Sequence, residues 1–187
     1  RNMALLAEQL VDEWLNRNGF FTIRGIKKGV HEIDLLGIRP RVDQLEGWHV
    51  EVQVSFRPVS YLGRLSKEDQ RELGAKSASS LKKRPRAIIE TGIKDWVEKK
   101  FQSALKRDMR ERSWRGIAWK YKFVHGAVFD PLELEFIKRS GVELVSFHEV
   151  LRALCNHKQG ELFGGAGTDI AEIIRYFAEQ PEKAQHG

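Results

Sequence analysis

Two apolar segments of this chain carry acidic residues where a buried β-strand ordinarily has none. Residues 49–56 (HVEVQVSF) alternate, with valines on one face and polar side chains that include Glu51 and Gln53 on the other. Residues 31–38 (HEIDLLGI) place Asp34 among apolar neighbours. Burying an ionised carboxylate costs several kcal/mol unless a positive group pairs with it. These acids therefore either lie in water at a sheet edge or hold a positive group.

The pattern of apolar residues along the whole chain predicts an α/β fold. Spacing of three to four residues indicates helices, and strict alternation indicates strands. The expected order is a helix up to Gly19, strands at 20–24, 30–38 and 48–56, helices at 66–81 and 92–112, a strand at 121–129, a helix at 131–141, a strand at 142–147 and a helix at 148–154. The second and third strands form an antiparallel pair, and the last strand–helix–strand unit is a parallel crossover. This order predicts a mixed central β-sheet flanked by α-helices.

The length of 187 residues suits one domain with an appendage. We assign residues 1–156 to the domain, and residues 157–187 to a glycine-containing linker followed by a C-terminal helix. Thr168 is the expected cap of that helix, which runs over 168–180 with an apolar side. The helix is a candidate oligomerisation element, and a homodimer is the assembly that it would form.

The charge of the chain favours an anionic partner. Lys and Arg total 32 against 26 Asp and Glu, which gives a net charge of +6 and a pI near 9.5. Nucleic acid is the commonest partner of such a protein, although a solvated basic surface gives the same composition. The candidate nucleic-acid-binding residues lie in the KKRPR segment, on the long helix and after the third strand: Lys82, Lys83, Arg84, Arg86, Lys99, Lys100 and Arg57. They would position the backbone without reading its sequence.

Cysteine usage and hydropathy suggest a cytoplasmic protein. The single cysteine, Cys155, has no internal disulfide partner, and no Cys/His spacing typical of zinc sites is present. No apolar run approaches the length that crosses a bilayer, so no membrane partner is expected. The N-terminal segment is an amphipathic helix that contains acids, which is not the pattern of a signal peptide.

The acids of the two strands suggest a metal site. Adjacent antiparallel strands bring Asp34 and Glu51 within a few Å of each other. Two such carboxylates raise each other's pKa unless a cation lies between them. An oxygen-rich pair suits Mg²⁺ or Mn²⁺, which bind through one or two carboxylates plus substrate oxygens.

The motif Asp34, followed after a hairpin by Glu51-Val52-Gln53, resembles that of the PD-(D/E)XK nuclease superfamily, the restriction-endonuclease-like fold. The first helix adds to the likeness, because Glu8 stands eleven residues before Gly19, as a helical glutamate does in archaeal Holliday junction resolvases. The resemblance covers roughly residues 4 to 150.

The resemblance implies a nuclease that hydrolyses DNA phosphodiester bonds with a metal-bound water, with RNA as the other option. Asp34, Glu51 and the carbonyl of Val52 would hold Mg²⁺ or Mn²⁺, and Glu8 would bind a second ion or its waters. Glu8 has an alternative interpretation as a solvated helix residue.

The chain departs from the superfamily pattern at two positions. Ile33 stands where the motif has proline, and Gln53 stands where it usually has lysine. An amide orients water by hydrogen bonds but supplies no charge and takes up no proton at neutral pH. Gln53 would therefore orient the attacking water. The alternative is a catalytically inactive nuclease-fold module that binds nucleic acid or a partner protein.

Overall fold

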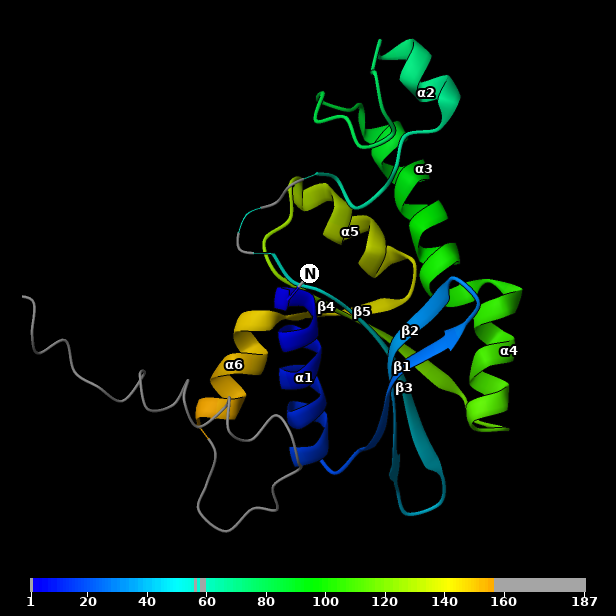
Figure 1. Cartoon of the computed structure of the whole chain (residues 1–187), viewed down its shortest axis with the longest axis vertical. Helices are drawn as coiled ribbons and strands as arrows, with labels where there is room; N and C mark the ends of the chain where they lie inside the picture. Colours follow the sequence, from blue (N-terminus) through cyan, green and yellow to red (C-terminus); the bar gives the residue numbers. More distant parts are fainter. Residues whose placement is uncertain (1, 56, 58–59, 157–187) are drawn as a thin grey trace, which may run out of the picture.

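The computed structural model describes residues 2–55, 57 and 60–156, without the side chains of residues 2–4 (Figure 1). The predicted tail at 157–187, including its helix, lies outside the described residues. The elements in chain order are α1 (Asn2–Arg17), β1 (Phe21–Lys28), β2 (His31–Pro40), β3 (Leu45–Gln53), α2 (Lys67–Glu72), α3 (Arg86–Val97), the π-helical turn η1 (Glu98–Gln102), α4 (Ala104–Ser113), β4 (Trp119–His125), α5 (Pro131–Arg139), β5 (Val142–Ser146) and α6 (Phe147–Cys155).

The five strands form one mixed sheet in the order β1-β2-β3-β4-β5. β1, β2 and β3 pair antiparallel, whereas β3, β4 and β5 pair parallel, and α5 is the crossover helix between β4 and β5. Helices cover both faces of the sheet (Figure 1). The structure thus confirms the predicted α/β class with a mixed central sheet. None of the helices that it describes is long and apolar enough to cross a membrane.

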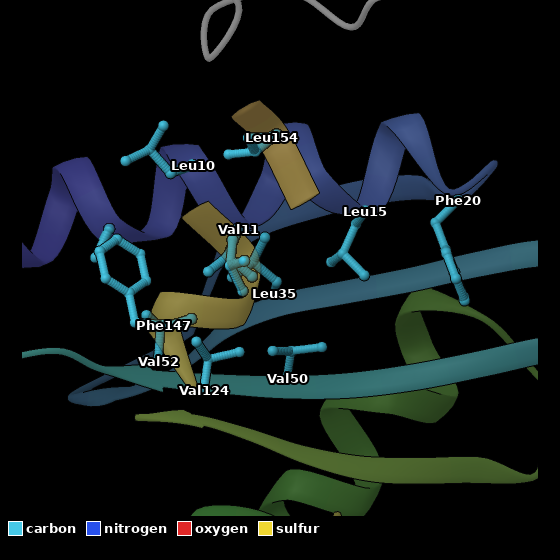
Figure 2. Packing of buried hydrophobic residues seen from close by; sticks show 12 residues of the cluster. Leu10, Val11, Leu15, Phe20, Leu35, Val50, Val52, Val124, Phe147 and Leu154 are labelled. Carbon is cyan, nitrogen blue, oxygen red and sulfur yellow. The ribbon is translucent and has the colours of Figure 1, made fainter. Parts of the chain in front are cut away.

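The alternation of β3 sorts its side chains between two cores. Val50 and Val52 join Leu35, α1 and α6 in a buried cluster, whose members Figure 2 shows meeting beneath α1. The opposite face of β4 carries Phe123 into a second cluster with α3 and α5. Glu51 lies on this second side of the sheet, opposite the valines, as its position in the strand predicts.

Two predicted helices are shorter than expected. The helix predicted over 66–81 begins as predicted, because Ser66 and Asp69 form a capping box. It ends at Glu72, and Gly74 lies just beyond with a φ of +58°, a conformation that ends helices. Lys82 Nζ binds the carbonyl oxygens of Leu73 and Gly74 at 2.8 Å each, which completes this stop.

The long helix predicted over 92–112 is in fact two helices joined by a π-helical turn. α3 runs into η1, and Ser103 then adopts an extended ψ of 150°. The Ser103 hydroxyl accepts a hydrogen bond from the Lys106 amide and so caps α4. The break changes which side chains face the sheet.

Strand boundaries shift by a few residues from the predicted ones. β3 begins at Leu45 rather than 48 and ends at Gln53, and β4 ends at His125 rather than 129. Beyond these ends the chains stay close, because the Gly126 amide binds the Gln53 carbonyl at 3.2 Å. A Cβ at Gly126 would lie 2.6 Å from the Ser55 oxygen, so glycine is required for this approach.

Candidate active site

Asp34 lies where the pairing of β2 with β3 stops. The last paired residues of this ladder on the site side are Leu35 and Val50. One residue further, Asp34 Oδ2 accepts the main-chain N–H of Val52 at 2.8 Å. The side chain of Asp34 thus takes the place of a backbone partner, and this position puts its carboxylate beside the strand that carries Glu51.

The Asp34 carboxyl group lacks full charge compensation. Burial and the nearby charge of Glu51 raise its pKa to about 7, although Lys100 and the Val52 amide act in the opposite direction. Glu8, on α1, adds to the same rise. Asp34 therefore exchanges its proton near neutral pH unless a further cation is supplied.

Glu51 is fully enclosed and strongly ionised. Its carboxylate receives Lys100 Nζ at 2.6 Å on Oε2, and Lys106 Nζ at 3.0 Å and His49 Nε2 at 3.1 Å on Oε1. The side chain is 1% exposed. Burial alone would raise the pKa of Glu51, but the hydrogen bond from His49 and the two lysines lower it to about 2.

A second layer fixes the orientation of His49. Arg110 Nη1, which always carries protons, donates to His49 Nδ1 at 2.9 Å. The one proton of the neutral ring must then lie on Nε2, which donates a hydrogen bond to Glu51. Complete burial lowers the pKa of His49 to about 4, so the ring is neutral. Arg110 is itself fixed by the Phe101 carbonyl at 2.7 Å.

Lys100 reaches the site from the π-helical turn. The sequence predicts Lys100 as a backbone-binding cation, and the structure instead places it against Glu51. Burial opposes its charge, but Glu51 and Asp34 outweigh that effect and raise the pKa of Lys100 above its usual range. A π-helical turn within a helix is frequent at functional sites. Lys100 therefore puts a permanent positive charge at the position where Gln53 supplies none.

The remaining predicted site residues border this cluster. A strand residue directs its N–H and its carbonyl to the same edge, so the Val52 carbonyl faces the side where the Val52 N–H binds Asp34. The neighbouring Gln53 carbonyl faces the other edge, where it accepts the Gly126 amide. Gln53 is exposed and lines a cavity of about 490 Å³ together with Lys100. Glu8 is half-buried, and burial followed by the charge of Glu32 raises its pKa.

The predicted nucleic-acid-binding residues do not form one basic face. Arg84 is 5% exposed and donates to the Gly63 carbonyl at 2.7 Å, so its assignment to a DNA-binding surface is wrong. Arg86 pairs with Glu135 at 2.9 Å, and Lys82 is engaged at the end of α2. All members of the set except Arg84 and the half-buried Lys100 are exposed, and Lys83, Lys99 and Arg57 are those for which the described residues show no side-chain hydrogen bond or ion pair.

The donor chemistry of this cluster fits a hard divalent cation. Asp34, Glu51 and the Val52 carbonyl offer oxygen ligands, which Mg²⁺ and Mn²⁺ prefer. The raised pKa of Asp34 marks negative charge that a cation would stabilise. Within the described residues, no three His, Cys, Asp or Glu side chains are grouped as a metal site. A metal ion here would therefore bind Asp34, share Glu51 with Lys100 and take its other ligands from the main chain and water.

Comparisons with known proteins add little. The sequence matches no protein-family profile, and no curated protein matches it. One solved structure, titled "Crystal Structure of Protein of Unknown Function AF1548", is similar with a TM-score of 0.43 and 14% identity, over 92% of this chain and 95% of that chain. A likeness of this size carries no argument about function.

Three residues of the site escaped the sequence analysis: His49, Lys106 and Arg110. His49 shares a strand face with Glu51 at period two, which is a usable signal. Lys106 and Arg110 are spaced four apart on α4 and face inward, a placement that helical periodicity hides among the other basic residues.

Proposed function

We propose that this protein is a metal-dependent nuclease that hydrolyses DNA phosphodiester bonds. One observation carries the proposal: Asp34 and Glu51 lie on adjacent strands with Lys100 Nζ 2.6 Å from Glu51, beside a cavity that Lys100 also lines. These groups suit metal-dependent phosphodiester hydrolysis, which uses ligands for a cation and a positive charge near the transition state. The resemblance of Asp34 and Glu51-Val52-Gln53 to the PD-(D/E)XK motif supports the same function.

Each residue has a defined role in this proposal. Asp34, Glu51 and the Val52 carbonyl would hold Mg²⁺ or Mn²⁺, which on binding supplies an activated water and polarises the phosphate. Lys100 replaces the lysine of the motif from another element and stabilises negative charge on the phosphate. Gln53 hydrogen-bonds and orients the attacking water. His49 and Lys106 hold Glu51 in one rotamer as positioning residues.

A second candidate function rests on the same contacts. Lys100 and Lys106 already engage both oxygens of Glu51, so the charge of this carboxylate is compensated without a metal ion. This arrangement favours a catalytically inactive nuclease-fold module that binds nucleic acid or a partner protein. The two functions differ in one measurable property, the requirement for a divalent cation.

The test is cleavage of supercoiled plasmid and branched DNA with Mg²⁺ or Mn²⁺, beside a chelator control. The nuclease proposal expects nicking by the wild type in the presence of metal and none with chelator. Glu51→Gln serves as the matched variant, because it keeps the shape of the side chain and removes its charge. Equal cleavage by this variant and the wild type would indicate a contaminating nuclease.

A further inference from the structure

A cavity formed by described residues lies directly beside the candidate site. Its volume is about 490 Å³, within the range of sites that enclose a small organic ligand. Gln53 and Lys100 form the side next to Glu51, and Trp96 on α3 lines it with Lys99 on η1. The cavity therefore continues from the place where a scissile phosphate would bind.

The opposite wall is the strap, which we define as residues 60–66. Two buried side chains from other segments hold the strap in place. Glu133 accepts the main-chain N–H groups of Leu62 at 2.6 Å and Gly63 at 3.1 Å, and Arg84 donates to the Gly63 carbonyl at 2.7 Å. Both anchoring side chains are at most 5% exposed. The strap is thus held in place without any ligand, so the cavity is preformed.

A close backbone contact sets the width of the cavity on the α3 side. Gly63 of the strap packs against Gly92 of α3, where an added Cβ would lie 2.7 Å from the Gly92 carbonyl carbon. Only glycine permits this approach. The two walls are therefore fixed close together at one end.

The lining combines an aromatic side chain with cations. Trp96 is half-buried, with its ring centroid 4.8 Å from Phe123 and 6.0 Å from Phe101. Arg64 and Lys99 are exposed at the rim, against one exposed acid, Asp95. An aromatic ring that stacks a base and cations that follow the phosphates are how proteins bind unpaired nucleic acid.

We propose that this cavity receives one unpaired nucleotide of the cleaved strand, so that the preferred substrate is single-stranded or locally unpaired DNA. The inference rests on the proposed nuclease function. Enzymes that act within a cavity of this size must take the nucleotide out of the base stack, and the cost of doing so is least where the base is already unpaired.

The test measures DNA binding by the wild-type chain in chelator, where metal-dependent cleavage does not occur. Fluorescence anisotropy compares a single strand, a blunt duplex of the same length and the same duplex with one bulged nucleotide. We expect affinity for the single strand and the bulge to exceed that for the blunt duplex by about tenfold. Equal affinity for all three would overturn the inference.

Variants separate the cavity from general electrostatics. Combined Arg64→Ala and Lys99→Ala should lower the preference for unpaired DNA about threefold or more, because both side chains line the cavity rim. Lys94→Ala is the control, since Lys94 is an exposed lysine of α3 that pairs with Glu90 away from the cavity. An unchanged preference in the double variant would refute the assignment.

Cleavage by the same proteins keeps the two proposals distinguishable. A wild type that prefers unpaired DNA in chelator yet never cleaves with Mg²⁺ or Mn²⁺ would refute the nuclease and retain the cavity as a binding site. A wild type that cleaves duplex and single strand equally, without a binding preference, would retain the nuclease and refute the cavity.

Discussion

Glu51 and Glu133 are two glutamates with the same burial and opposite acid–base behaviour. Each is 1% exposed. Three side chains donate to Glu51, two of them lysines, and its pKa falls to about 2 despite burial. Glu133 receives only main-chain N–H groups, and burial raises its pKa to about 7. Side-chain hydrogen-bond donors, among them two lysines, and not burial, decide which glutamate stays charged.

The position of the nearest cation explains the difference. Arg84 lies close enough to lower the pKa of Glu133 somewhat, but its guanidinium donates to the carbonyls of Gly63 and Ser80. One oxygen of Glu133 consequently has no hydrogen-bond partner among the described residues. Glu51 is thus built to remain an anion at neutral pH, as a metal ligand must, whereas Glu133 is suited to hold the strap with or without a proton.

Glu51→Gln should have the largest effect on the protein. The change leaves Lys106, itself 4% exposed, without a counter-charge, and removing one partner of a buried pair costs about 3–5 kcal/mol. The free energy of unfolding from urea titration should fall by that amount, and plasmid cleavage should be lost. A stability equal to that of the wild type would show that the lysines do not depend on Glu51.

The next largest effect is expected at Lys100, the more exposed of the two lysines that pair with Glu51. Lys100→Met should lower single-turnover cleavage about 10²- to 10³-fold, since it removes positive charge from the transition state. Metal affinity measured by calorimetry should stay or increase, because Lys100 and the ion share Glu51. Adding Gln53→Lys should recover part of the rate. A rate unaffected by Lys100→Met would exclude this lysine from catalysis.

Asp34→Asn should have the opposite effect on stability from Glu51→Gln. The pKa of Asp34 is raised from 3.8 to about 7, so its contribution to stability is lost as pH rises through that window. At pH 8 without metal, the variant should therefore be more stable by about 4 kcal/mol. Differential scanning calorimetry with and without Mg²⁺ checks this, because the ion should stabilise the wild type alone.

The smallest expected effect is the pH dependence of stability that Glu133 causes. Its pKa is raised from 4.5 to about 7, so unfolding free energy should decline by about 2 kcal/mol as pH rises over that range. Glu133→Gln should flatten the decline in urea titrations at several pH values. Glu135→Gln, on the exposed side of α5, is the control and should leave it intact. A decline that persists in Glu133→Gln would assign it to another group.

The alternation of apolar and polar residues was sufficient to predict the strands of the candidate site. The alternation of HVEVQVSF put Glu51 opposite the valines, and the antiparallel pairing put Asp34 next to that strand. Both result from a period of two and a short hairpin, which are local properties. The capping box at Ser66 was readable for the same reason.

The cations of the site depended on contacts that periodicity does not encode. A continuous helix over 92–112 would put Lys106 and Arg110 on an outer face, and the π-helical turn with the break at Ser103 turns them inward. In the sequence Arg84 belongs to a basic segment, but in the structure it is buried and donates to a carbonyl of the strap. Such tertiary contacts override the surface preference of lysine and arginine.

The position of the Lys100 ammonium group depends on the number of residues in the π-helical turn. Successive residues of an α-helix are rotated by roughly 100° about its axis, and a π-turn accommodates one residue more than an α-turn does. Deleting Glu98 or Lys99, which precede Lys100, would let α3 continue as an ordinary helix and rotate Lys100 about its axis. Such a deletion would move the ammonium group away from Glu51 without altering any strand.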